Sequence, residues 1–216
     1  MEQDQCTLLI LGTRTFAIEV LDLASEIANV KVVGFVENMY PKKCHDLLGG
    51  LPVIWVDNLD KYAKDHVAVC ALGTTFRSRF TNQAASYGIR FRSLVHPLAR
   101  ISARSTIGEG SIISVGAIIA SHTQIGCHVI VNRGALIGHH TKIGNYVTIG
   151  PGANIAGSCT INDAVYIGMG AVIIDNVIIG SHAVIGAGSV VTENVPDNVQ
   201  VVGVPAKIVK ENISGK

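Results

Sequence analysis

The sequence predicts two domains: a small parallel α/β domain over residues 1–95, similar to a Rossmann sheet, and a parallel β-helix over residues 96–216. In the first part, apolar runs of strand length alternate with amphipathic helical patterns. In the second part, every sixth residue from Ile101 to Val191 is Ile or Val. A period of six fits neither a helix nor an alternating strand, and it is typical of a chain that coils with three short faces per turn.

The repeat predicts an interior built from stacked branched side chains. One Ile or Val per face points inward, and three faces of six residues make one coil of 18 residues. Residues 18 apart therefore lie on adjacent rungs, roughly 4.8 Å apart. The repeat is long enough for about five such coils. Small residues, Gly126 and Gly138 among them, often follow the inward residue, and we expect them at corners with tight backbone and positive φ.

The α/β domain is expected to begin with a buried strand, a helix and a second strand. Further strands and a second helix follow, and after the repeat we expect an exit loop and a short helical tail. The predicted strands cover residues 6–12, 30–36, 52–55 and 66–72, and the predicted helices cover residues 16–24 and 77–87.

Ligands of parallel sheets bind beyond the carboxyl ends of the strands, where helix N-termini offer free N–H groups. The residues expected there are Gly12, Thr13, Arg14, Glu37, Asn38 and Gly73. The GxGxxG fingerprint is absent, so a nicotinamide cofactor is not expected. Arg14 is either a pyrophosphate ligand or a solvated loop cation, and Glu37 is either a ribose or base partner or a surface charge.

Composition excludes several functional classes. The net charge is +1 and charged residues make up 15%, so neither nucleic acid nor an anionic membrane is an expected partner. The segment MEQDQC lacks the pattern of a signal peptide, which favours the cytoplasm. Five cysteines at unrelated spacings favour neither disulfides nor a zinc framework, and Cys159 is interpreted as a packing residue.

Several motifs together extend over nearly the whole chain. They are the α/β domain, the joint Val95-His96-Pro97, the hexapeptide run and the terminal motif GVPAK at residues 203–207. In this combination the chain resembles the bacterial sugar O- and N-acyltransferase family, which includes sialic-acid O-acetyltransferases and N-acetyltransferases of nucleotide-linked 4-amino-4,6-dideoxy sugars. The resemblance implies a left-handed β-helix and a homotrimer. It also implies a nucleotide-linked amino sugar in the α/β domain and acetyl-CoA as co-substrate, bound along the β-helix between subunits.

The resemblance also implies roles for individual residues. His139 matches the family's general base, Asn132 matches a polar residue facing the same site, and Gly157 matches the backbone donor to the oxyanion. Coil arithmetic independently puts Gly157 one rung from His139. His140 replaces the usual acidic residue after the base, which would orient the imidazole and raise its pKa. For the CoA chain the implied residues are Thr148, Gly157, Met169, Ala187, Pro205 and Lys207.

Other functions remain open at this stage. The leading hypothesis is acetyl-CoA-dependent N-acetylation of the 4-amino group of a nucleotide-linked 4-amino-4,6-dideoxyhexose, in bacterial surface-glycan synthesis. The alternatives are O-acetylation of a sialic-acid-like sugar and a non-catalytic trimer. Zinc is disfavoured because the HxxxxH spacing of hexapeptide carbonic anhydrases is absent, although His122 and His140 stack one coil apart. His122, His128 and His182 are predicted to be exposed turn residues.

Overall fold

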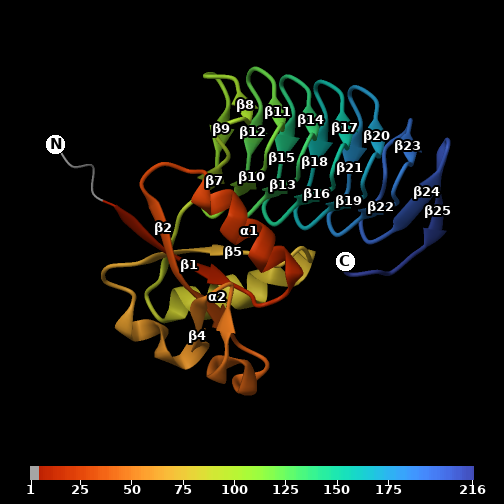
Figure 1. Cartoon of the computed structure of the whole chain (residues 1–216). Helices are drawn as coiled ribbons and strands as arrows, with labels where there is room; N and C mark the ends of the chain where they lie inside the picture. Colours follow the sequence, from red (N-terminus) through yellow and green to blue (C-terminus); the bar gives the residue numbers. More distant parts are fainter. Residues whose placement is uncertain (1–4) are drawn as a thin grey trace.

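The computed structural model describes residues 5–216; residues 1–4, part of the segment from which the location is predicted, lie outside the described residues. The chain forms an α/β domain that packs beside one end of a long β-helix (Figure 1). The predicted fold class is confirmed.

A six-stranded sheet in the order β3-β4-β2-β1-β5-β6 forms the centre of the α/β domain. The sheet is parallel except at its edge, where β3 runs antiparallel to β4. Its strands and the two α-helices are β1 (Cys6–Leu11), α1 (Thr15–Ser25), β2 (Val30–Glu37), β3 (Leu47–Leu48), β4 (Leu51–Trp55), β5 (Val67–Cys70), α2 (Ser78–Ser86) and β6 (Arg90–Phe91). Three 3₁₀ turns, η1 (Pro41–His45), η2 (Val56–Lys61) and η3 (Thr75–Arg77), complete it.

Two apolar clusters cover the two faces of this sheet. Leu8 and Ile10 of β1 pack with Val20 of α1, whereas Leu9 and Leu11 pack with α2. Burial on both faces explains why the first strand is continuously apolar rather than alternating. The four predicted strands and both predicted helices of this domain are present.

Three sheets, parallel except for β25, form the β-helix. The first contains β7 (Leu94–Val95), β10 (Ile112–Ile113), β13 (Ile130–Val131), β16 (Thr148–Ile149), β19 (Tyr166–Ile167), β22 (Val184–Ile185), β24 (Gln200–Gly203) and β25 (Ala206–Lys210). The second contains β8 (Arg100–Ile101), β11 (Ile118–Ile119), β14 (Leu136–Ile137), β17 (Asn154–Ile155), β20 (Val172–Ile173) and β23 (Val190–Val191). The third contains β9 (Thr106–Ile107), β12 (Gln124–Ile125), β15 (Lys142–Ile143), β18 (Thr160–Ile161) and β21 (Ile178–Ile179).

The ladder of inward side chains is confirmed. Strands pair with a register of 18 residues, for example Ile112 with Ile130 and Ile119 with Ile137. The inward Ile and Val residues form one continuous buried cluster, together with the small residues that precede them, such as Ala117 and Ala135. We call the turn from the first to the second sheet the first corner, the turn from the second to the third sheet the second corner, and the return to the first sheet the third corner.

The reason given for the small residues after each Ile needs correction. Gly126 does not have positive φ; a Cβ there would lie 2.7 Å from the backbone carbon of Gly144 on the next rung. Close approach of adjacent corners therefore requires glycine. The left-handed conformation falls two residues later, at positions occupied by Gly134 (φ 67°) but also by His128 (φ 55°) and His140 (φ 58°).

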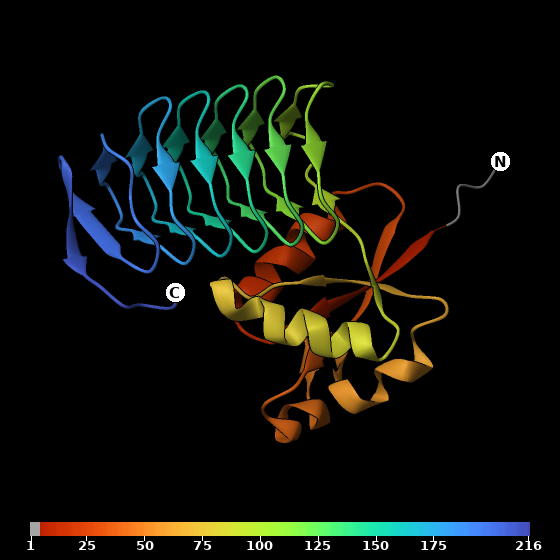
Figure 2. The same ribbon diagram turned by 180° about the vertical axis from the view of Figure 1, so that it is seen from behind.

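The helical tail predicted after Lys207 is wrong. Ala206–Lys210 is a strand, β25, which forms an antiparallel hairpin with β24, and Pro205 lies in the turn. β24 in turn extends the first sheet, because Gln200 and Val201 pair with Val184 and Ile185. After the hairpin the chain runs back toward the α/β domain (Figure 2), where the Lys216 carbonyl oxygen accepts from Thr74 Oγ1 at 2.5 Å and from Thr75 N at 2.6 Å.

The two domains share a buried interface. Leu94, Ile112 and Ile130 on the outer side of the first sheet belong to the same apolar cluster as α1. Leu94 and Val95 already pair with β10, so the β-helix begins at the joint itself. The α/β domain thus covers the first rungs of one face.

Candidate active site

All six residues predicted at the carboxyl ends of the strands line one cavity of about 390 Å³ in the α/β domain. They come from the loop after β1, the end of β2 and the loop after β5. The wall of this cavity therefore combines polar loop residues with aromatic and aliphatic side chains. Its other lining residues are Thr15, Phe16, Met39, Tyr40, Ala71, Leu72, Thr74 and Phe80.

Glu37 is neither a surface charge nor a free ligand group. Its side chain is buried, Oε1 accepts from the backbone N–H groups of Met39 (2.8 Å) and Asn38 (3.0 Å), and Oε2 accepts from Thr13 and lies 3.5 Å from Lys43 Nζ. Burial would raise the pKa of Glu37, but these hydrogen bonds and the Lys43 charge lower it below its usual 4.5. Glu37 therefore holds the loop after β2 in place.

Arg14 is exposed and lies immediately before α1 at the mouth of the cavity. Among the described residues its guanidinium has no bonded partner, and no side chain caps α1. A helix N-terminus beside a free cation suits a phosphate group.

The second corner brings His139, His140 and Gly157 together. His139 Nδ1 lies 3.1 Å from His140 Nδ1, with the two rings nearly perpendicular. A Cβ on Gly157 would lie 2.6 Å from Cε1 and 2.8 Å from Nε2 of His139. Only glycine therefore leaves room for the imidazole, and the predicted adjacency of His139 and Gly157 is present.

The other turn histidines differ from one another. His122 stacks on His140 at 4.8 Å between ring centroids, and both are exposed, as is His182. The predicted exposure of His128 is wrong: it is 6% exposed, its ring meets Phe91 edge-on at 4.6 Å, and α2 and β6 cover its corner. Across residues 5–216, no three or more His, Cys, Asp or Glu side chains converge as a metal site would require.

Thr148 is also covered by the α/β domain. It is 3% exposed, and its Oγ1 accepts from Arg77 Nη1 at 2.8 Å. Arg77 itself is fully buried and donates to the carbonyl oxygens of His128 (2.8 Å) and Val147 (2.7 Å). The expected contact between Thr148 and CoA is therefore not supported, because this side chain faces Arg77 rather than an open surface.

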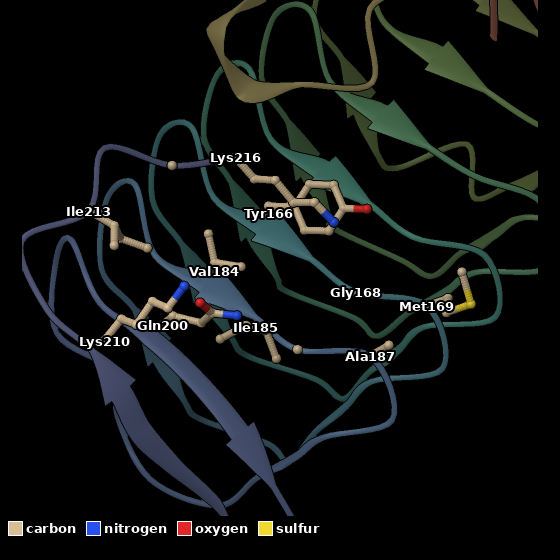
Figure 3. Close-up of a pocket in the computed structure, with 12 residues that line it drawn as sticks. Tyr166, Gly168, Met169, Val184, Ile185, Ala187, Gln200, Lys210, Ile213 and Lys216 are labelled. Carbon is tan, nitrogen blue, oxygen red and sulfur yellow. The ribbon is translucent and has the colours of Figure 1, made fainter. Parts of the chain in front are cut away.

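Met169 and Ala187 lie on successive turns of the first corner, at one end of a groove of about 420 Å³ (Figure 3). Gln200, Lys210 and Ile213 lie at the other end, and Lys216 Nζ lies 4.0 Å from the centre of the Tyr166 ring. Pro205 and Lys207 are exposed in the β24–β25 hairpin outside this lining.

Asn132 is on the first corner, one corner before His139 in the chain, and its Nδ2 donates to the Ile149 carbonyl at 3.0 Å. Within one protomer it therefore does not share the corner of His139. The position within the six-residue repeat alone does not distinguish corners, because each such position recurs on all three.

Sequence reasoning missed Arg77 and the segment ending at Lys216. Neither lies in a recognisable motif. An arginine that directly precedes an amphipathic helix gives no local sign that it will be buried against another domain.

Two 36-residue stretches, residues 122–157 and 158–193, match the family model described as bacterial transferase hexapeptide (six repeats). Solved acetyltransferase structures superpose on nearly the whole chain. The chain is therefore a hexapeptide-repeat acyltransferase, as the resemblance implied.

Three of the similar solved structures cover nearly the whole chain. A mutant of perosamine N-acetyltransferase from Caulobacter crescentus, in complex with CoA and GDP-perosamine, is 27% identical over 95% of this chain and 97% of its own, with a TM-score of 0.87. The acetyltransferase domain of PglB from Neisseria gonorrhoeae, in complex with acetyl coenzyme A, is 28% identical over 96% and 100%, with a TM-score of 0.86. WeeI from Acinetobacter baumannii is 29% identical over 94% and 100%, with a TM-score of 0.85.

No curated protein sequence gives a significant match. Within residues 5–216, none of the helices has the length and apolar character needed to span a bilayer.

Proposed function

We propose that the protein transfers the acetyl group of acetyl-CoA to the 4-amino group of a nucleotide-linked 4-amino-4,6-dideoxyhexose, in the cytoplasm and in bacterial surface-glycan synthesis. The observation that carries this proposal is the convergence of all six predicted substrate residues around one cavity. The Caulobacter relative, which superposes over nearly the full chain, is solved with GDP-perosamine and CoA, and this supports the same pair of substrate classes.

In the proposed reaction the sugar amine attacks the thioester carbon directly. A C–N bond forms, the C–S bond breaks, and the proton lost by nitrogen passes to His139 Nε2 and then to the departing CoA thiolate. His139 Nε2 is the available base because Nδ1 faces His140. The backbone N–H of Gly157, beside the ring, donates to the developing oxyanion. Two of the Caulobacter structures carry a replaced histidine, which supports a functional histidine in this class.

The two substrates have adjoining candidate sites. Residues 1–95 would hold the nucleotide sugar, with Arg14 and the start of α1 at the pyrophosphate. CoA would lie along the groove of Met169 and Ala187, where Lys210 and Lys216 offer cations to its phosphates. Thr74 lines the sugar cavity and donates to Lys216, which lines the groove, so the two spaces meet at this contact.

This arrangement supports the homotrimer that the resemblance implies. The groove lies on the first sheet, whereas His139 lies on the second corner, so a complete site would take His139 from a neighbouring copy. Exposed apolar side chains on the outer side of the second sheet, Ile118 (44% exposed), Leu136 (39%) and Val172 (37%), suit contact between copies. Light scattering would measure the assembly mass directly.

The test is thiol release from acetyl-CoA with UDP-, dTDP- and GDP-linked 4-amino sugars, with 4-hydroxy sugars and sialic acid as controls. Turnover on one amino-sugar nucleotide is expected. His139→Ala should lower kcat by about 10²–10⁴ while CoA binding stays unchanged, because a general base is lost. His182→Ala, an exposed turn histidine elsewhere on the helix, is the control.

Turnover only on sialic acid would favour O-acetylation, and no CoA binding at all would favour a non-catalytic trimer. Full activity of His139→Ala would remove this residue from the mechanism.

A further inference from the structure

The second corner holds two adjacent histidines, His139 and His140, whose rings are in contact. No carboxylate contacts His139 among the described residues. Asp175, two rungs further along the same line, is hydrogen-bonded to the amide of Asn176 at 2.8 Å. The nearest side-chain acceptor for His139 is therefore His140 Nδ1 at 3.1 Å.

A contact between two imidazole nitrogens requires one N–H and one lone pair. If His140 donated, the proton of neutral His139 would be on Nε2, and the nitrogen beside Gly157 could not act as a base. If His139 donates from Nδ1, its Nε2 keeps the lone pair. Only the second arrangement is compatible with general-base chemistry at this corner.

His140 is itself held in orientation. Its ring stacks on His122 with an angle of 11° between planes, and His122 Nδ1 lies 2.8 Å from Ser121 Oγ. His122 and His140 occupy equivalent positions one coil apart, both with positive φ, so the register of the β-helix aligns the two rings. The stack leaves His140 little freedom to turn Nδ1 away from His139.

We infer that His140 is a positioning residue: it accepts the Nδ1–H of His139 and so fixes the tautomer that makes Nε2 the base, with Ser121 and His122 holding its ring. A neutral imidazole thereby takes the orienting role of a carboxylate. This inference rests on the proposed function for the role of His139, but the tautomer can be measured without any substrate.

The first experiment is NMR of the full chain labelled with ¹⁵N-histidine, at a pH at which the imidazoles are neutral. His139→Gln and His140→Asn assign the signals. We expect His139 as the Nδ1–H tautomer and His140 as the Nε2–H tautomer, with a shift of His139 toward Nε2–H in His140→Ala. The reverse tautomers, or no change in His140→Ala, would overturn the inference.

The second experiment is steady-state kinetics. His140→Ala should lower kcat about 10- to 100-fold with both KM values unchanged, because an outer partner of an imidazole orients it without binding substrate. His140→Asn, which keeps an acceptor and tolerates positive φ, should stay close to wild type. His182→Ala places Ala at an equivalent left-handed position (φ 59°) far from His139, so it controls for backbone strain.

A kcat loss shared by His182→Ala, or full activity of His140→Ala, would contradict the positioning role. Absence of acetyl transfer in the wild type would defeat the proposed function alone, since the NMR result would still decide the tautomer.

Discussion

The second and third corners of the β-helix both carry a histidine at the left-handed turn position, but the two histidines differ in burial. His140 stacks on His122 at the second corner, and His128 stacks on Tyr146 at the third corner, with centroid distances of 4.8 and 5.1 Å. The α/β domain covers the third corner at His128 and Tyr146, but it does not cover the second corner at His122 and His140. The repeat therefore aligns the rings, whereas the neighbouring domain decides whether they are buried or available for chemistry.

Burial changes the titration of the covered histidine. Removal from water and the nearby Arg77 charge lower the pKa of His128 from 6.5 to about 4. Its Nδ1 is buried without a hydrogen-bond partner among the described residues. A neutral, packed His128 is thus part of the interface, while His139 and His140 stay exposed to solvent.

The largest effect on stability is expected from weakening the interface between the α/β domain and the third corner. Arg77→Met should lower the free energy of unfolding by about 2–4 kcal/mol, because the His128 carbonyl and Thr148 hydroxyl lose a charged donor inside the protein. Arg79→Met on the exposed side of α2 is the control and should change it by less than about 0.5 kcal/mol. Urea unfolding measures the free energy of unfolding of both variants. Equal losses in the two variants would show that the buried Arg77 does not stabilise the domain interface.

The same substitution at the two corners sharpens the comparison. His128→Asn should cost about 2 kcal/mol, since it removes a buried ring that packs on Phe91 and Tyr146. His122→Asn should change stability by less than about 0.5 kcal/mol, because that ring is exposed. Asn tolerates the positive φ at both sites, so backbone strain is matched. Similar losses in thermal or urea unfolding would mean that burial does not distinguish the corners.

The smallest expected effect is a pH dependence of the free energy of unfolding, which arises from His128 at the covered third corner. Below pH 6.5 the unfolded chain protonates this histidine, whereas the folded chain keeps it neutral until about pH 4, so stability falls as the pH falls. Between pH 7 and 5.5 the loss from His128 should be about 1 kcal/mol. The lowered pKa of Glu37 affects stability only at lower pH.

Urea unfolding at these two pH values tests this dependence. His128→Gln should reduce the slope, and His182→Gln, at the equivalent exposed position three coils away, should keep it. An unchanged slope in His128→Gln would assign the pH dependence to other groups.

Much of the molecule could be predicted from local pattern. The strands of the ladder and the coil of 18 residues follow from one inward Ile or Val per six residues, and the adjacency of His139 and Gly157 follows from that register. The loops around the cavity of the α/β domain were predicted because parallel strands end at the same edge of a sheet. The tail was mispredicted because a short segment such as residues 208–210 has no fixed preference until an open strand, here β24, offers it hydrogen bonds.

The sequence by itself determined which residues point into the β-helix and which stand at its corners, because a strict period encodes inward and outward direction at every rung. Only the tertiary structure decided which corner is covered. The burial of Arg77, Thr148 and His128 depends on how a non-repeating domain docks on one of three similar faces. That choice is made by contacts between residues far apart in the chain, and no local period records it.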